Sequence, residues 1–178
     1  MYEEVLQFWF EEIEPEKWFV SDPVFDAEIR RRFPGLLQST AQGEQYAWRV
    51  SPRGRLAEII VLDQFSRNLL RGTPQAFAQD PMALALAQEA VAAGLHRGLA
   101  PAERTFLLMP YMHSESRLIH VQAEILFREF APRENYEFEL RHKAIVDRFG
   151  RYPHRNAVLG RTSSAEEAAF LRQPGSGF

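Results

Sequence analysis

Three segments of the chain open with a polar residue followed by proline: Asp22-Pro23, Ser51-Pro52 and Asp80-Pro81. The polar side chain can accept hydrogen bonds from the free N–H groups at the start of a helix, and proline suits the first helical position. Gly72 and Gly94 follow two of these segments, and glycine commonly ends a helix in the left-handed conformation. The pattern predicts helices over residues 23–32, 52–72 and 80–94.

The rest of the chain also spaces its apolar residues as helices do. Further helices are expected over residues 2–13, 36–42, 101–109, 111–130, 133–149 and, after a capping box at Ser163–Glu166, 165–171, with a tail over 174–178. No segment alternates apolar and polar residues as a half-buried strand does. These patterns predict an all-α fold, a single-domain array of about seven to nine helices over residues 1–178.

The composition excludes several classes of protein. Apolar residues make up 46% of the chain, enough for a substantial core, and the net charge of −3 argues against a nucleic-acid partner. Cysteine is absent, which excludes disulfides and thiolate sites. No apolar run has the length of a membrane span, and the N-terminus lacks the pattern of a signal peptide. We therefore expect a cytoplasmic protein with no membrane partner; the oligomeric state stays open.

Two charged residues fall on the apolar face of the segment 52–72. Leu56, Ile59 and Ile60 define that face, and Asp63 and Arg67 lie in the middle of it, four residues apart. Charges on a core face are costly unless they are paired and hydrogen-bonded. Either the two residues form a structural ion pair with a neighbouring helix, or they form one wall of a site in which Arg67 faces an anion.

The segment 111–130 also carries polar residues on an apolar side. That side is marked by five residues, Leu118, Ile119, Val121, Ile125 and Leu126. Glu115 and Gln122 point into it, and His113, in the first turn, can turn inward. Glu115 is either a satisfied buried carboxylate or part of a site. His120 and Glu124 lie on the opposite side, and we expect them on a solvated face.

The segment 133–149 and the loop after it complete the set. His142 lies within the apolar stripe of Phe138, Ile145 and Phe149, where a lone histidine is more often a core residue than a ligand. The stretch Arg148–Arg161 is rich in arginine and echoes the segment Leu62–Gly72, since both contain an aromatic residue, then Arg-Asn, then apolar residues. We expect the two stretches to meet in one polar site.

The candidate catalytic residues are His113, Glu115, His142 and His154. The candidate ligand-binding residues are Asp63, Arg67, Asn68, Gln122, Arg151, Arg155, Asn156 and Arg161. Arginines beside histidines and carboxylates suit an anionic small molecule, and a histidine beside a carboxylate can serve as a general acid or base. The histidines and Glu115 could in principle hold a metal, but no metal-binding spacing is present and nearby arginines disfavour a cation. No metal and no cofactor are expected.

Four motifs in order resemble a known bacterial family. They are Val5–Phe10, Leu62–Asn68, Pro110–Glu115 and Arg148–Arg161. Together they are similar to the family known as domain of unknown function 924, with Ser66 and Tyr152 where proline and phenylalanine are expected. The resemblance implies an all-helical, tetratricopeptide-repeat-like superhelix, although the textual repeat of such proteins is absent. It implies no established activity.

A second functional class fits the same sequence. A helical scaffold could bind a peptide or protein partner on a concave face, with the polar cluster serving only to hold the helices together. This alternative predicts an open groove lined by exposed aromatic residues, with Trp9, Trp18, Phe19 and Trp48 as the candidates. The first class instead predicts an enclosed polar pocket.

Overall fold

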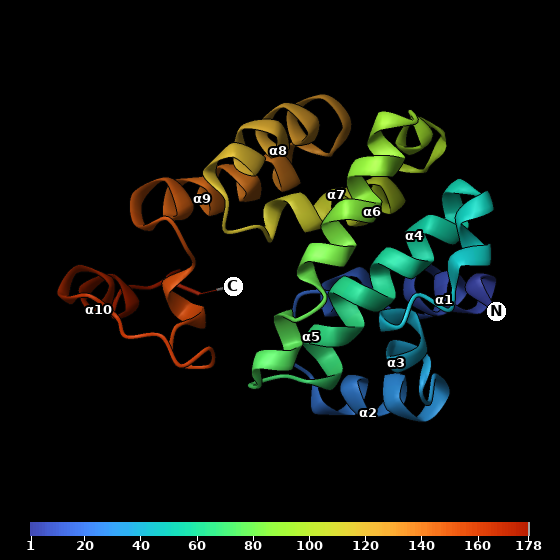
Figure 1. Ribbon diagram of the computed structural model, residues 1–178, viewed down its shortest axis with the longest axis horizontal. Helices are drawn as coiled ribbons and strands as arrows, with labels where there is room; N and C mark the ends of the chain where they lie inside the picture. Colours follow the sequence, from blue (N-terminus) through green and yellow to red (C-terminus); the bar gives the residue numbers. More distant parts are fainter. Residues whose placement is uncertain (178) are drawn as a thin grey trace.

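The computed structural model describes residues 1–177, so Phe178, the last residue of the expected tail, lies outside the described part. Within that part every regular element is a helix (Figure 1). The α-helices are α1 (Tyr2–Gln7), α2 (Pro23–Arg32), α3 (Leu36–Ala41), α4 (Pro52–Ile60), α5 (Ser66–Leu69), α6 (Asp80–Ala92), α7 (Pro101–Met112), α8 (Arg117–Phe130), α9 (Arg133–Phe149) and α10 (Ala165–Leu171). The all-α prediction is confirmed; the tetratricopeptide-like superhelix and the single domain stay predictions.

Short 3-10 and π-helical turns connect these helices. The 3-10 turns are η2 (Pro15–Lys17), η3 (Tyr46–Val50), η5 (Pro74–Phe77), η6 (Leu95–Gly98) and η7 (Pro153–Arg155). The π-helical turns are η1 (Phe8–Glu12), which continues α1, and η4 (Val61–Phe65), which joins α4 to α5. The predicted helix 2–13 therefore ends in a π-turn, and the predicted helix 52–72 is interrupted by one. Such turns occur frequently at functional sites.

Two of the three predicted polar caps are confirmed. Asp22 accepts hydrogen bonds from the backbone N–H groups of Val24 and Phe25, and Ser51 accepts one from Gly54. Asp80 was expected to cap its helix, but it lies inside α6, and its carboxylate is used in ion pairs instead. The capping box of the last helix is formed by Ser164 and Glu167, one residue later than the expected Ser163–Glu166.

The expected long helix 111–130 is two helices that turn at His113–Ser116. Its buried face is also the reverse of the predicted one: His120 and Phe127 are buried, whereas Leu118 is 70% and Val121 51% exposed. The prediction was wrong because it weighed the apolar residues alone. The Nδ1 atom of His120 lies 2.7 Å from the Glu139 carboxylate of α9, so the imidazole and the carboxylate form a buried hydrogen bond between α8 and α9.

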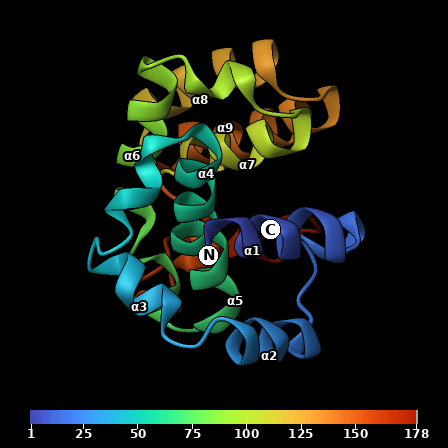
Figure 2. The ribbon, with the colours of Figure 1, turned by 90° about the vertical axis from the view of Figure 1, so that its right-hand side faces the viewer.

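Two hydrophobic clusters of residues within 1–177 hold the fold. The larger one joins α1, α4, α6 and α7, and aromatic rings from both π-turns meet within it, with Trp9 and Phe65 centroids 5.8 Å apart. The smaller one contains Ile145, Val146 and Tyr152 and lies where the C-terminal stretch returns to α9. Figures 1 and 2 show α4 passing α1 on one side of the molecule, and Figure 1 shows α9 and α10 at the other end. None of the described helices has the length and apolar character needed to cross a membrane.

Candidate functional site

The centre of the site is a buried network of ion pairs. Asp63, on the π-turn η4, is 1% exposed, and its Oδ1 atom lies 3.1 Å from Arg67 Nη1. Arg67 also donates to both carboxylate oxygens of Asp80 on α6, at 2.8 and 3.0 Å. Asp63 and Arg67 thus form the expected ion pair. Asp80, which the sequence assigned to a helix cap, was missed as its third member.

His113 extends this network from the connection between α7 and α8. Its Nδ1 atom lies 2.7 Å from Asp63 Oδ1. Burial, together with the nearby Arg67 charge, lowers the pKa of His113, so the ring is neutral at neutral pH. Burial opposes ionisation of Asp63, but the Arg67 charge, the contact with His113 and the hydrogen bond from Gln64 together outweigh it and hold the pKa of that carboxyl below its usual range. An ionised carboxylate only accepts, so Nδ1 of His113 carries the proton and Nε2 is left as a base.

Arg155, on η7, joins the C-terminal stretch to the same network. Its side chain is 7% exposed. Its Nη2 atom donates to the His113 carbonyl at 3.0 Å, and Nη1 reaches Asp80 at 3.3 Å. The guanidinium lies over the rings of Phe77 and Tyr152, 4.6 and 4.7 Å from their centroids. The two Arg-Asn stretches thus approach one another, as predicted. Asp80 and His113, which belong to neither stretch, bridge them.

Arg155 is the cation of the network with the weakest compensation. Its Nε atom is buried and has no hydrogen-bond partner among residues 1–177. Burial, followed by repulsion from Arg67, lowers the pKa of the guanidinium. The charge is therefore held in place by Asp80 at a long distance and by aromatic faces, an arrangement that an added anion would stabilise.

A cavity of about 220 Å³ opens beside these residues, and we call it the histidine–arginine cavity. Its lining is Arg67, Arg71, Gly72, Ala76, Phe77, His113, His142, Tyr152, His154 and Arg155. Burial lowers the pKa of His142 to about 3 and that of His154 to about 4. Three neutral histidines and three arginines therefore surround one space. A second cavity of about 380 Å³ shares His113 and Arg155 and also touches Asp80 and Glu115.

Glu115 holds the C-terminal loop rather than the smaller cavity. Its carboxylate pairs with Arg161 through two hydrogen bonds of 2.7 and 2.9 Å and accepts a third from the Tyr152 backbone N–H at 2.7 Å. Burial works against ionisation of Glu115, but the hydrogen bonds from Arg161 and Tyr152 lower its pKa overall. The carboxylate of Glu115 is therefore satisfied, as one of the two expected roles required, but it is half-buried, with 26% of its side chain exposed.

Besides Arg161, which pairs with Glu115, four predicted ligand-binding residues lie away from the histidine–arginine cavity. Asn68 donates to Asp26 at 2.8 Å, and Gln122 is exposed on α8. Arg151 pairs with Glu167 at 2.6 Å, and Asn156 bonds Ser163 at 3.0 Å. Gln122 was predicted to point inward, and this was wrong because the buried face of α8 is the one that carries His120. The other three stabilise the loop or the contact between α2 and α5.

Two buried residues beside the cavity were missed by sequence reasoning. His120, expected on a solvated face, is fully buried, and its Nε2 atom lies 2.8 Å from the Ser114 carbonyl and 3.1 Å from the Tyr152 hydroxyl. Glu139 is also fully buried, and burial raises its pKa. The available signal was that His120 and Glu139 lie on two consecutive helices, α8 and α9. Each of the two residues taken alone resembles an ordinary surface residue.

The contacts also bear on the metal and scaffold alternatives. Within residues 1–177 no three His, Asp or Glu side chains are arranged to hold a metal ion. Of the aromatic residues expected to line an open groove, Trp9 is 0% and Trp48 is 9% exposed, whereas Phe19 is 64% exposed. The expectation was wrong for Trp9 and Trp48, which belong to the core.

Comparison with known proteins places the chain in a family. Protein of unknown function ATU0120 from Agrobacterium tumefaciens has a solved structure similar to this one, with a TM-score of 0.91, 33% sequence identity and coverage of 96% of each chain. No curated protein matches the chain. A family model described as a bacterial protein of unknown function, DUF924, matches residues 5–175. The chain therefore belongs to the DUF924 family, whose function is unknown.

Proposed function

We propose that the protein binds a small anionic molecule in the histidine–arginine cavity and that His113 accepts a proton there. The observation that carries this proposal is the combination of a buried, under-compensated Arg155 with neutral histidines around one space. A carboxylate or phosphate group would supply the missing acceptor for Arg155. Because Arg67 is held by Asp63 and Asp80, and Arg155 by Asp80, the free-energy cost of ordering these two side chains on ligand binding is small.

The cavity also limits the size of the ligand. Pockets for drug-sized molecules measure roughly 300–1,000 Å³. A space of about 220 Å³ fits a smaller molecule, such as a short carboxylic acid or inorganic phosphate. The neutral histidines add groups that both donate and accept hydrogen bonds without adding charge. They suit a ligand with hydroxyl or carbonyl groups beside its anionic group.

The Asp63–His113 pair supplies the chemistry. Asp63 fixes the tautomer of His113, so that Nε2 is the basic atom, and it stabilises the imidazolium that forms when a proton is taken up. A ligand or a water molecule bound next to Nε2 would lose a proton to it. This arrangement supports ligand binding that is coupled to proton transfer. We extend the proposal to turnover of the bound ligand, for which the same proton transfer would be the first step.

Isothermal titration calorimetry with acetate, malonate, pyruvate and phosphate at constant ionic strength tests the proposal. We expect one of these anions to bind the native protein in preference to a neutral analogue. Arg155→Lys and Arg71→Gln should weaken that binding by about tenfold or more, since the first removes the unpartnered Nε–H donor and the planar guanidinium, and the second removes a charge-assisted hydrogen bond. The matched control is Arg148→Gln, which changes an exposed arginine paired with Glu166 outside the cavity.

Two results would count against the proposal. One is that none of the anions binds in preference to its neutral analogue. The other is that binding persists unchanged in Arg71→Gln and Arg155→Lys, which would place the ligand elsewhere. For the proton-transfer part, Asp63→Asn should abolish the dependence of the binding enthalpy on the ionisation enthalpy of the buffer. An unchanged dependence would remove His113 from the role of base.

A further inference from the structure

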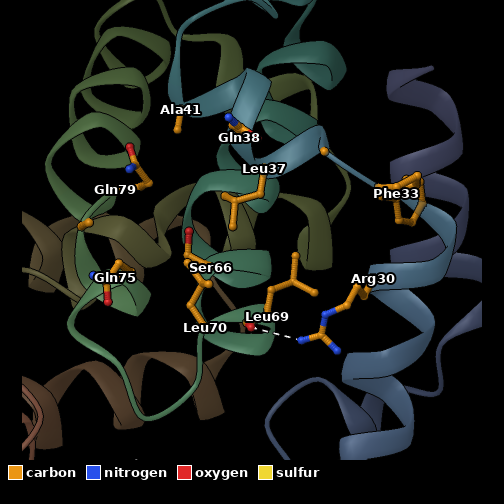
Figure 3. Close-up of a pocket in the computed structure, with 13 residues that line it drawn as sticks. Arg30, Phe33, Leu37, Gln38, Ala41, Ser66, Leu69, Leu70, Gln75 and Gln79 are labelled. Carbon is orange, nitrogen blue, oxygen red and sulfur yellow. Dashed lines mark hydrogen bonds between the residues drawn. The ribbon is translucent and has the colours of Figure 1, made fainter.

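A third cavity lies between α2, α3, α5 and η5 (Figure 3). It measures about 400 Å³, within the range of small-molecule sites. We call it the leucine groove, after Leu37, Leu69 and Leu70 in its wall. Phe33, Ala41 and Ala78 add to that wall, so most of its surface is apolar. None of the residues proposed to bind the first ligand lines it.

One cation stands at the edge of this groove. Arg30 extends from α2, and its Nη2 atom donates to the Leu69 carbonyl at 3.2 Å, as Figure 3 shows. Among residues 1–177 it forms no ion pair, unlike its neighbours Arg31 and Arg32, which pair with Glu28 and Glu12. A guanidinium has five N–H donors, so most of those of Arg30 are available to a ligand.

A buried hydroxyl in the groove floor adds a second, independent observation. Ser66, the first residue of α5, is fully buried, and its Oγ atom has no hydrogen-bond partner among the described residues. A serine inside a helix normally bonds a backbone carbonyl of the preceding turn, but here that turn is π-helical. An unpartnered buried hydroxyl is unfavourable, so the hydrogen bonding of this wall is left incomplete in the free protein.

We propose that the leucine groove binds a medium-chain carboxylic acid. The hydrocarbon chain lies against Leu37, Leu69 and Leu70, and the carboxylate binds the free donors of Arg30. Charge complementarity at one end and an apolar wall along the rest select an amphipathic anion over a wholly polar one. This site is separate from the histidine–arginine cavity in both its residues and its ligand.

Calorimetric titration of the full chain with octanoate, octanol and acetate tests this proposal. Octanoate should bind, octanol should bind about tenfold more weakly because it lacks the charge, and acetate should not bind in the groove because it lacks the chain. Arg30→Gln should reduce octanoate binding to the level of octanol. The matched control is Arg31→Gln, which changes the next residue of α2, an exposed arginine paired with Glu28. It should leave the affinity for octanoate unchanged.

A groove-filling variant locates the ligand. Ala41→Trp places a large side chain in the groove and should abolish octanoate binding, while Arg155→Lys should leave it intact. If octanoate binds Arg30→Gln and Ala41→Trp as tightly as it binds the native protein, or does not bind the native protein, the proposal is wrong. Loss of octanoate binding in Arg155→Lys alone would assign the acid to the histidine–arginine cavity, and the leucine groove would then have no ligand.

Discussion

His142 provides a direct test of the electrostatics of the site. It lies on α9 with its side chain buried, and its Nδ1 atom donates to the Phe138 carbonyl at 2.8 Å. Burial lowers its pKa from 6.5 to about 3. The neutral form is therefore favoured by folding, so the stabilisation is complete above the unfolded pKa of 6.5 and is lost progressively as the pH falls below it.

The magnitude follows from linkage. Each pH unit below 6.5 favours the protonated unfolded chain by about 1.4 kcal/mol until the folded pKa is reached. At about pH 5 the free energy of unfolding should have fallen by about 2 kcal/mol through His142 alone. Because His154 is depressed in the same direction, to about 4, native protein should lose more than this between pH 7 and about pH 5.

Urea denaturation of the native protein and of His142→Asn between about pH 7 and about pH 5 measures this effect. Asparagine keeps a donor for the Phe138 carbonyl but does not titrate. The variant should be less stable at neutral pH, and its deficit should shrink by about 2 kcal/mol at the acidic end. Ile145→Ala, a neighbouring buried residue on α9, is the control, and its deficit should not vary with pH. A constant deficit in His142→Asn would refute the reasoning.

Two further predictions concern stability away from the cavity. Arg49→Ala leaves the fully buried Glu58 without its bidentate partner and should cost about 3–5 kcal/mol in urea denaturation, whereas a change within about 1 kcal/mol would mean that solvent screens the pair. Gly54→Ala places a Cβ atom 2.1 Å from the Trp48 carbonyl oxygen and should lower the thermal midpoint, with a loss of about 1–3 kcal/mol; Gly98→Ala, which meets nothing within 4 Å, should be close to neutral, and equal effects would contradict the clash.

The sequence predicted the helices well and their buried faces less well. Proline and glycine act locally, so the bounds of α9 and the start of α4 follow from neighbouring residues alone. The face of α8 depends on a partner, because His120 is buried only when Glu139 arrives from α9. No periodicity within one helix contains that information.

The candidate site shows the same division. Asp63 and Arg67 could be found because a carboxylate and a guanidinium on an apolar face are costly unless they are paired. Asp80 could not, because aspartate before proline has a sufficient local explanation as a cap. Its actual role depends on Arg155, which lies 75 residues further along the chain. Long-range pairs of this kind are decided by the tertiary fold, and a single sequence does not record them.

The π-turn η4 holds one extra residue in the continuous stretch from α4 to α5. A π-turn has one residue more per hydrogen-bonded turn than an α-helix, so the helices on its two sides keep their phase. Deleting a single residue within Val61–Phe65 would therefore let the helix become regular and leave Ser66 and Arg67 in phase with α4. A deletion within α4 has no such compensation, and it would turn Asp63, Ser66 and Arg67 by about 100° relative to the start of that helix. The chain should therefore tolerate the loss of a residue in the π-turn better than in α4, because the phase of this stretch positions residues of both the histidine–arginine cavity and the leucine groove.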